Sequence, residues 1–443
     1  MKKLTRNEVL QRLKEDDVHF LRLQFTDIMG INKNVEVPPS EFTKAVDGQI
    51  MFDGSSVEGF ARIEESDMLL KPDLSTYALL PWPEPQGRVA RIICDIYNPD
   101  GTPFPGCPRG VLKRMCEKAK SLGFTMQAGP EPEFFLFLRG ENGEPTARTH
   151  DSGGYFDLTP IDQGEDARRA IVVALNAMGF SVEAAHHEVA PAQHEIDFRH
   201  RPALECADAI ATFRFVVRKV AMDFGLHATF MPKPIFGING SGMHVHQSLF
   251  RGKSNAFHDP KDANGLSQVA RGYIAGLLRR SKEFCAVTNP LVNSFKRLVP
   301  GYEAPTHIAW SDRNRSPLAR VPARRGAGTR VELRMPDPAC NPYLALTVML
   351  AAGLEGIENN WDPGPPVNRN IFAMSQRQRR RYKIDSLPDN LGQAIGYMNK
   401  SKFVRQALGD HIYSNYLEAK KKEWLEYIAL VHDWELERYL GSY

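Results

Sequence analysis

The sequence predicts an α+β protein with two domains, a small strand-rich one followed by a larger one that mixes helices and strands. Residues 18–97 carry short runs of β-branched and aromatic residues separated by turn signals, a pattern typical of strands. Residues 98–108 are dense in Pro, Gly, Asn and Asp, so we expect the domain boundary there. The predicted domains are residues 1–100 and 105–443.

Helical stretches dominate the second domain, between strand-like pieces that carry most of the polar motifs. Asn341 directly before Pro342 predicts an N-cap followed by a first-turn proline. We expect the stretch 424–440 to be an ordinary packed helix rather than a partner-binding motif. The expected helices cover residues 109–122, 165–178, 205–224, 266–284, 342–358 and 413–440.

Composition narrows the class of protein. The chain has 443 residues, of which 42% are hydrophobic and 25% charged, with a net charge of +3, so no global attraction to nucleic acid or membrane is expected. The N-terminus lacks the apolar core of a signal peptide, and the longest apolar stretch, residues 343–354, is too short to span a bilayer. The 6 cysteines form no CxxC pair, which favours reduced thiols and a cytoplasmic protein.

The first candidate site is the pair Glu131 and Glu133, separated by one proline and followed by the apolar run 134–137. Residues two apart in a strand point to the same face. Two carboxylates beside a core are costly unless a cation neutralises them, and a divalent metal ion would do so. An exposed strand end with two solvated glutamates explains this segment equally well.

Three later segments add polar groups at strand spacing. Residues 186–198 hold three histidines, two glutamates and one aspartate, alternating at their end with apolar residues as in a half-buried strand. His244 and His246 share one strand face after a glycine-rich turn. Glu332 and Arg334 also share a face, although a simple ion pair would explain that pair alone.

Together these segments offer carboxylates and imidazoles but no thiolates, a ligand set that suits Mg²⁺ or Mn²⁺. Several carboxylates near arginines favour metals that clamp phosphates. A phosphate-binding loop is absent, because the glycine required five residues before Gly252 is Gln247. The arginines between 293 and 334 favour an anion-lined pocket over nucleic-acid binding, and we interpret the basic run 377–381 as a solvated helix face.

At these segments the sequence closely resembles the type I glutamine synthetase family. The matching motifs keep the family's order over nearly the whole chain. They are Phe52–Ser56, Gly129–Glu133, His187–Pro191, Lys233–Pro234 through Gly240–His244, Asn293–Pro305, Asn314–Ser316, and Val331–Arg334 leading to Asn341–Tyr343.

The resemblance implies an N-terminal β-grasp domain and a C-terminal glutamine synthetase/guanido kinase-like catalytic domain. It implies a homo-oligomer, a dodecamer of two stacked hexameric rings, with active sites between neighbouring subunits. The implied reaction joins ammonium to the γ-carboxylate of glutamate through γ-glutamyl phosphate, consuming ATP. The implied cofactors are two or three Mg²⁺ or Mn²⁺ ions per subunit.

The resemblance also implies residue roles. The metal nearer glutamate is expected to bind Glu131, Glu188 and Glu195, and the metal nearer ATP to bind Glu133, His244 and Glu332. The expected glutamate pocket is Asn239, Gly240, Arg297, Glu303, Arg315 and Arg334. The expected ATP contacts are Glu183, His246, Ser248, Arg315 and Arg320. The expected catalytic residues are Asp53 as the base for ammonium, Glu303 in a closing loop, and Arg315 at the moving phosphoryl group.

Departures from the family pattern indicate the subgroup. The adenylylated subgroup has a tyrosine before Asp-Leu-Pro, whereas this chain has Ile384 before Asp385 at that place. It therefore resembles the alpha subgroup, which glutamine inhibits directly, and Arg62 matches that subgroup's regulatory arginine. In some members the C-terminal tail contacts nitrogen-responsive transcription repressors.

Two alternatives remain at this stage. A related ligase would join glutamate to a polyamine or ethanolamine, but the presence of Asp53 and of the Glu303 loop favours ammonium. A non-catalytic assembly protein of the same fold should have lost metal ligands, whereas all six matching positions hold Glu or His.

Overall fold

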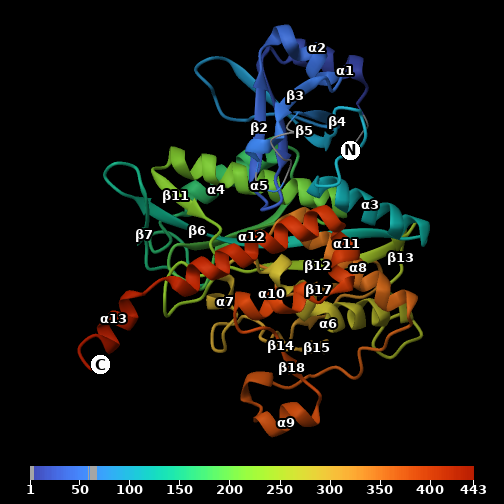
Figure 1. Cartoon of the computed structure of the whole chain (residues 1–443), viewed down its shortest axis with the longest axis vertical. Helices are drawn as coiled ribbons and strands as arrows, with labels where there is room; N and C mark the ends of the chain where they lie inside the picture. Colours follow the sequence, from blue (N-terminus) through green and yellow to red (C-terminus); the bar gives the residue numbers. More distant parts are fainter. Residues whose placement is uncertain (1–3, 58, 60–66) are drawn as a thin grey trace.

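A computed structural model describes residues 4–57, 59 and 67–443 (Figure 1). The N-terminal domain is a five-stranded sheet in the order β2-β1-β5-β4-β3, in which β1 and β5 are parallel and the other neighbours antiparallel. Its elements are α1 (Arg6–Glu15), β1 (Val18–Thr26), β2 (Asn32–Val37), α2 (Phe42–Val46), β3 (Ile50–Asp53), β4 (Asp67–Leu79) and β5 (Arg88–Tyr97).

The second domain is built on an 11-stranded sheet whose main path is β15-β16-β17-β12-β6-β9-β8. Neighbours on this path are antiparallel except β15 and β16. The path strands are β6 (Thr125–Arg139), β8 (Val182–His187), β9 (Gln193–Phe198), β12 (Met243–Arg251), β15 (Trp310–Ser311), β16 (Ala319–Arg320) and β17 (Val331–Leu333). The shorter strands of this sheet are β7 (Pro145–Thr149), β10 (Arg201–Pro202), β11 (Leu226–Thr229) and β13 (Ser254–Asn255). Strands β14 (His307–Ile308) and β18 (Asp385–Ser386) form a separate two-stranded sheet.

Five of the six predicted helices lie within four residues of their predicted ends. They are α3 (Pro108–Ser121), α4 (Glu165–Ala177), α5 (Ala203–Asp223), α6 (Gln268–Thr288) and α8 (Pro342–Glu358). The predicted N-cap is confirmed, because the Asn341 side chain accepts hydrogen bonds from the backbone of Tyr343 at 3.0 Å and Leu344 at 3.4 Å. The remaining helices are α7 (Ser294–Arg297), α9 (Gln376–Arg381), α10 (Leu391–Asn399), α11 (Lys402–Leu408), α12 (Asp410–Ala429) and α13 (Asp433–Tyr439).

Helices α6 and α8 pack closely because small residues line their contact. A Cβ added at Gly276 would lie 1.9 Å from the carbonyl oxygen of Ala352, and one at Gly356 would lie 2.0 Å from the carbonyl oxygen of Gly272. Only glycine allows backbones to approach this closely. The pair therefore forms a rigid support for the sheet that carries the candidate site.

The predicted C-terminal helix is wrong in its continuity and in its packing. Helix α12 ends at Ala429, the backbone of Leu430 is extended, and α13 starts again at Asp433. Trp434 is 58% exposed and Leu440 is 77% exposed, so this segment is not an ordinary packed helix. Figure 1 shows α13 projecting from the body of the chain.

The basic run 377–381 lies on helix α9. No residue of α9 is buried, which confirms the predicted solvated helix face. Within residues 4–57, 59 and 67–443, no helix is both long and apolar enough to cross a bilayer.

A buried arginine joins the two domains. The guanidinium of Arg109, on α3, donates to Asp208 on α5 at 2.9 and 2.8 Å, to Asp95 on β5 at 3.0 Å and to Asp73 on β4 at 2.8 Å. Arg109 is 3% exposed. One cation therefore neutralises carboxylates that come from both domains.

Replacing Arg109 with Met should destabilise the protein by about 3–5 kcal/mol, because several carboxylates lose their buried counter-charge. A lower urea midpoint, followed by circular dichroism, would measure this loss. Arg405→Met is the control, since its ion pair with Asp410 is at the surface and should contribute less than about 1 kcal/mol. Equal midpoints for the two variants would contradict the structural role of Arg109.

Candidate active site

The register of three strands brings together a first group of candidate ligands. The β6–β12 register places Glu131 opposite His244, and the β12–β17 register places Glu332 opposite His246. The Nδ1 atom of His244 lies 3.4 Å from Glu131 Oε2 and 3.8 Å from Glu332 Oε1. One ligand atom from each of Glu131, His244 and Glu332 lies within 4.8 Å of the others.

A second group lies on the neighbouring strands. The β8–β9 register places His186 opposite Glu195, and β6 places Glu133 opposite the same Glu195. His186 Nε2 is 3.2 Å from Glu195 Oε1, and His186 Nδ1 is 3.7 Å from Glu188 Oε1. Ligand atoms of His186, Glu188 and Glu195 again lie within 4.8 Å of one another.

The two groups exchange one carboxylate relative to the sequence-based expectation. The resemblance placed Glu131 with Glu188 and Glu195, but the structure places Glu131 in the group of His244. Glu133 lies opposite Glu195 in the β6–β9 register, and burial followed by the charges of Glu188 and Glu195 raises its pKa. The charge of Glu131 also raises the pKa of Glu195. Strand register decides which side chains of neighbouring strands meet. The separation of Glu131 and Glu133 by one residue on β6 does not show this register.

Crowding of like charges defines the electrostatics of this site. Burial raises the pKa of Glu133, and the neighbouring carboxylates Glu188 and Glu195 raise it further. Burial also raises the pKa of Glu188, and burial together with Glu131 and Glu188 raises the pKa of Glu195. Each carboxylate would therefore ionise fully only with a cation nearby.

Glu332 behaves differently because arginines surround it. Burial acts to raise its pKa, but the charges of Arg334, of the two histidines on β12 and of Arg320 lower it to about 2. Arg334 Nη1 donates to Glu332 Oε1 at 2.6 Å, and Arg320 Nε donates to Glu332 Oε2 at 2.5 Å. Glu332 is thus ionised and fixed in place.

This donor set fits divalent cations. The two groups contribute carboxylate oxygens and imidazole nitrogens, which Mg²⁺ and Mn²⁺ accept, and no thiolate among the described residues joins them. A divalent ion in each group would also remove the like-charge repulsion that raises the glutamate pKa values. The chain therefore has residues suited to hold two such ions.

Both groups open into one cavity of about 1110 Å³. Its wall includes the predicted phosphoryl-binding residues Arg315 and Arg320, and also Glu303. A smaller cavity adjoins it and shares Glu303 and Arg334 with it. The predicted glutamate-pocket residues lining the smaller cavity are Asn239, Gly240, Arg297, Glu303 and Arg334; Arg315 lines the larger one.

The arginines of the smaller cavity differ in how many of their donors are free. Arg297 donates to the backbone carbonyls of Met335 at 2.8 Å and Arg334 at 3.1 Å. The Arg334 Nε is buried and has no hydrogen-bond partner in the part of the chain that the structure describes. Arg334 therefore keeps a donor available for an anionic ligand.

Some predicted ATP contacts lie outside these cavities. Glu183 is exposed and pairs with Arg199 at 3.5 Å, and Ser248 lies further along the β12 face that carries the histidines. His246 Nε2 lies 2.6 Å from Glu131 Oε1, so it contacts a candidate metal ligand directly. The structure brings Arg315 and Arg320 into the larger cavity but not Glu183, Ser248 or His246.

Two predicted residues belong to the N-terminal domain. Asp53 ends β3, where its Oδ1 accepts from the backbone and hydroxyl of Ser55 at 2.8 and 2.6 Å. These hydrogen bonds lower the pKa of Asp53, which keeps it ionised. Asp53 lines neither cavity of its own chain, and Arg62 lies outside the described residues.

The sequence reading missed several residues of the larger cavity. Tyr155 and Phe156 form part of its wall from a loop that carried no motif. Asp197 also lines it, and burial followed by the charge of Glu195 raises the Asp197 pKa to about 9. Strand alternation could have found Asp197, because it lies two residues after Glu195, whereas nothing in the sequence indicated the tyrosine and phenylalanine.

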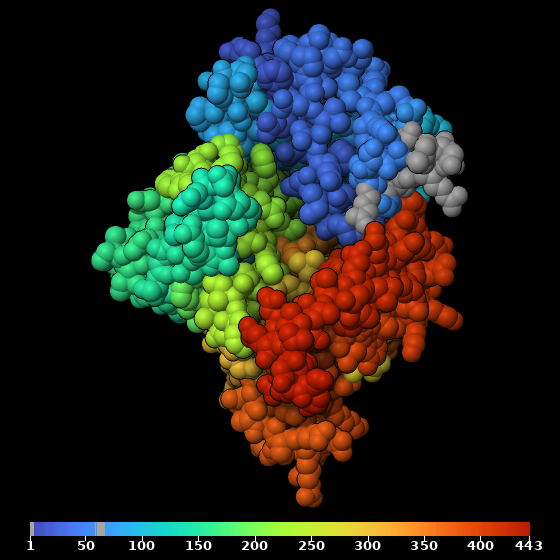
Figure 2. Space-filling model, turned by 60° about the vertical axis from the view of Figure 1, so that its left-hand side comes forward, coloured from blue at the N-terminus to red at the C-terminus, as the bar shows by residue number. Residues whose placement is uncertain are grey.

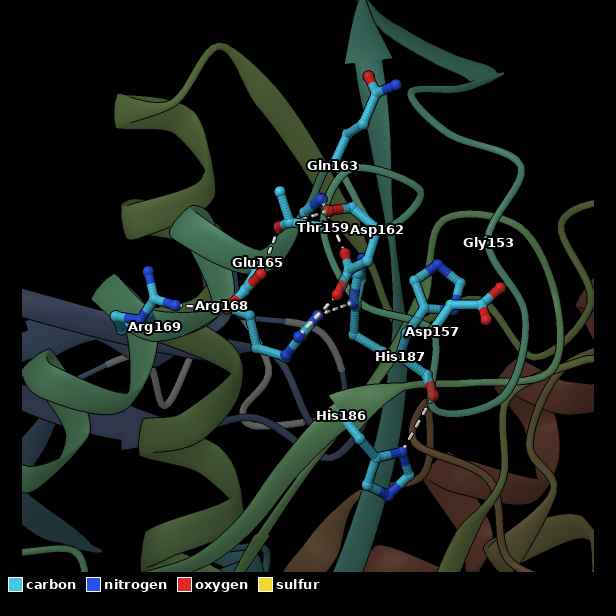
Figure 3. Close-up of polar contacts among 12 residues, drawn as sticks. Gly153, Asp157, Thr159, Asp162, Gln163, Glu165, Arg168, Arg169, His186 and His187 are labelled. Atoms are coloured by element: carbon cyan, nitrogen blue, oxygen red, sulfur yellow. Dashed lines mark hydrogen bonds and ion pairs between the residues drawn. The ribbon is translucent and has the colours of Figure 1, made fainter.

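A buried polar network lies behind β8 and β9 (Figure 3). Arg168 Nη2 is 2.7 Å from Asp162 Oδ2, and Arg168 Nη1 is 2.9 Å from His194 Nδ1. Asp151 lies 3.2 Å from His187 Nε2 and accepts from the backbone of Ala192 at 2.8 Å. Arg168 pairs with Asp162, and His150 and His187 contact Asp151, so each carboxylate already has partners within the protein. We therefore interpret this network as a support for the strands that carry Glu188 and Glu195.

The larger cavity combines carboxylates suited to divalent cations with arginines, and it adjoins a smaller cavity that also contains arginines. This combination is typical of enzymes that handle phosphoryl groups. Profiles of two families match the chain, "Glutamine synthetase, beta-Grasp domain" over residues 17–99 and "Glutamine synthetase, catalytic domain" over residues 105–439. The chain belongs to the glutamine synthetase family. The expected α+β class with an N-terminal β-grasp domain is thereby confirmed.

Similar proteins span the whole chain. A glutamine synthetase of Thermus thermophilus is 62% identical over 99% of both chains, and those of Clostridium saccharobutylicum and Methanosarcina mazei are 58% and 57% identical over at least 99% of both. Among solved structures, a GmaS/ADP complex is 30% identical with a TM-score of 0.89, covering 98% of this chain and 99% of that one. Plasmodium falciparum glutamine synthetase, 24% identical with a TM-score of 0.87 over 99% and 100%, shares the fold.

Metal binding should release protons, because the raised pKa values of Glu133, Glu188 and Glu195 favour their protonated forms without metal. Mn²⁺ affinity should therefore rise with pH, by about ten-fold per pH unit for each proton released. Calorimetric titration in buffers of different ionisation enthalpy would count these protons.

Two variants test whether the protons come from these carboxyl groups. Glu195→Gln should weaken Mn²⁺ binding and reduce the proton release, whereas Glu358→Gln, on the exposed end of α8, should change neither. Metal affinity that is independent of pH in the unmodified protein would show that these carboxyls are not the ligands.

Proposed function

We propose that the chain uses this cleft to make glutamine from glutamate, ammonium and ATP, with ADP and phosphate as the other products. The family membership and the full-length identity of 54–62% to glutamine synthetases give the overall reaction. The observation that carries the assignment is the convergence of two carboxylate groups and of Arg315, Arg320 and Arg334 on one cavity. The polyamine, ethanolamine and non-catalytic alternatives are not favoured by these relatives.

Charge neutralisation explains why this cleft suits the reaction. Glutamate and ATP are both anionic, so they approach only where positive charge offsets their repulsion. Divalent ions bound by the two carboxylate groups would supply most of that charge and would polarise the phosphoryl oxygens. Arg315 and Arg320 line the same cavity, where their guanidinium groups can hold the transferred phosphoryl group.

The first step joins the two substrates. The γ-carboxylate of glutamate attacks the γ-phosphorus of ATP, and γ-glutamyl phosphate and ADP result. The free Nε of Arg334 is available to hold the α-carboxylate of glutamate in the smaller cavity. The solved GmaS relative of the same fold is a complex with ADP, which supports nucleotide binding by this chain.

The second step requires ammonia and the exclusion of water. Glu303 lines both cavities, so the loop that carries it is placed to cover the acyl phosphate. Ammonium must lose a proton before the resulting ammonia can attack the carbonyl carbon of γ-glutamyl phosphate. We assign that proton to Asp53 of a neighbouring copy, since Asp53 is ionised, exposed and remote from the cavities of its own chain.

This assignment requires a homo-oligomer, and we propose the dodecamer of two hexameric rings that the family resemblance implies. The exposed C-terminal segment supports contacts between copies, because Trp434, Leu436 and Leu440 are 58%, 44% and 77% exposed. A hollow between the N-terminal domain, α5 and α12 is another candidate contact (Figure 2). Its lining combines apolar residues with four basic and two acidic side chains.

Regulation and location complete the proposal. We assign the chain to the alpha subgroup, in which glutamine inhibits through Arg62, and to the cytoplasm, where its six cysteines would stay free. The exposed C-terminal tail could also present a surface to a nitrogen-responsive repressor. The metal is Mg²⁺ or Mn²⁺.

One assay tests both the reaction and its regulation. The unmodified enzyme should form glutamine and phosphate in equal amounts, and Glu303→Ala should lower glutamine formation by about 100-fold, because substrate positioning and water exclusion at the two cavities both suffer. Arg62→Ala should keep the activity of the unmodified enzyme but lose inhibition by added glutamine. Phosphate release with another amine but not with ammonium would overturn the substrate assignment, and unchanged inhibition would overturn the regulatory one.

The oligomer has its own test. Replacing Leu436 and Leu440 together by Asp should place charge in an apolar contact between copies and reduce the molar mass measured by light scattering. Val173→Asp is the control, since Val173 is 65% exposed on α4 and should leave the mass unchanged. An unchanged mass in the double variant would remove the C-terminal segment from the interface.

A further inference from the structure

Lys233 is a buried cation with no carboxylate partner. It follows β11, is 8% exposed, and makes no ion pair within the described part of the chain. Its ammonium group donates to the carbonyl of Ile238 and lies 3.7 Å from the centre of the Tyr302 ring. A carbonyl oxygen and an aromatic face therefore replace the carboxylate that a buried lysine usually has.

The backbone of Lys233 is fixed from the opposite side. Its N–H donates to Asn293 Oδ1 at 2.7 Å, and Asn293 Nδ2 donates to the Lys233 carbonyl at 2.9 Å. The side chain thus extends from a fixed point, and the position of its ammonium group is well determined.

The two groups that this ammonium contacts come from two segments that line the smaller cavity. Ile238 directly precedes Asn239 and Gly240, and Tyr302 directly precedes Glu303. The aliphatic part of the Lys233 side chain also packs against Gly240, since a Cβ added at Gly240 would lie 3.2 Å from Lys233 Cδ. One side chain therefore connects the predicted glutamate-binding turn with the loop that carries Glu303.

The loop of residues 300–303 has few other polar contacts through its side chains. The side chains of residues 300–303 make no hydrogen bond or ion pair among the residues that the structure describes. Glu303 nevertheless adopts φ +60°, which a residue with a Cβ rarely adopts, and Gly301 adopts φ +99°. Such a conformation persists only where surrounding contacts hold it.

We propose that Lys233 is a positioning residue that holds the Glu303 loop against the Asn239–Gly240 turn, and so keeps water from the acyl phosphate. The inference rests on the proposed reaction through γ-glutamyl phosphate. In the productive step ammonia attacks the γ-carbonyl carbon and phosphate leaves. When the loop opens, water attacks the same carbon, the same C–O bond breaks, and glutamate, phosphate and a proton are released. Each such event consumes one ATP without forming glutamine.

The ratio of phosphate released to glutamine formed therefore measures the role of Lys233. The unmodified enzyme should give a ratio near one with saturating Mg²⁺, glutamate, ATP and ammonium. Lys233→Met keeps the length of the stem but removes the charge, and should raise the ratio at least about two-fold. Lys233→Arg retains a cation near the ring and should restore most of the coupling.

A matched control is available on the surface. The Lys296 ammonium lies 5.6 Å from the Tyr427 ring centre and donates to its hydroxyl at 3.1 Å, so Lys296→Met removes a similar pair elsewhere. This control should keep the ratio near one. Tyr302→Leu removes the ring from the other side of the contact, and should raise the ratio as Lys233→Met does.

The outcomes separate the inference from the function. A merely structural role for Lys233 would lower the rates of phosphate release and glutamine formation together, and an unchanged ratio in Lys233→Met would overturn the proposal. If Lys233→Met does not fold, a ratio near one in Tyr302→Leu overturns it instead. An unmodified enzyme that forms no glutamine would overturn the proposed function itself, independently of both variants.

Discussion

The mutual repulsion of glutamates on one sheet face is the constraint on which the rest of the active site depends. Burial raises the pKa of Glu133, Glu188 and Glu195, and each also feels the like charge of at least one carboxylate in the same cleft. A folded domain tolerates this arrangement only by protonating the carboxyls or by binding cations. The same unsatisfied negative charge that disfavours the empty cleft makes it a strong site for divalent ions.

The surrounding structure serves to keep these groups in place. Rigid packing of α6 on α8 supports the sheet, and the network of Asp151, Asp162 and Arg168 fixes the strands that present Glu188 and Glu195. Arg320 and Arg334 do the same for Glu332. Preorganised charge of this kind costs little rearrangement when substrates arrive, which favours catalysis.

The proposed role of Asp53 requires a second copy of the chain. Asp53 lies on the N-terminal sheet, outside both cavities of its own chain, while apolar side chains of α13 remain exposed. Both observations are explained if copies associate, since a neighbour can then supply the base and cover the apolar surface. Within one chain, by contrast, Lys233 contacts both the carbonyl of Ile238 and the ring of Tyr302, from two segments that line the smaller cavity.

Local chemistry in the sequence determined the helices, the N-cap at Asn341 and the shared face of Glu131 and Glu133, because these depend on residues close along the chain. The candidate metal ligands were also evident, and the cavity contains all six of them. Only the tertiary structure decided that Glu131 joins His244 and not Glu188, that α13 leaves the body, that Tyr155 lines the larger cavity and that Lys233 contacts Tyr302. Those features depend on strand register and on contacts between distant segments, which spacing along one strand or helix does not specify.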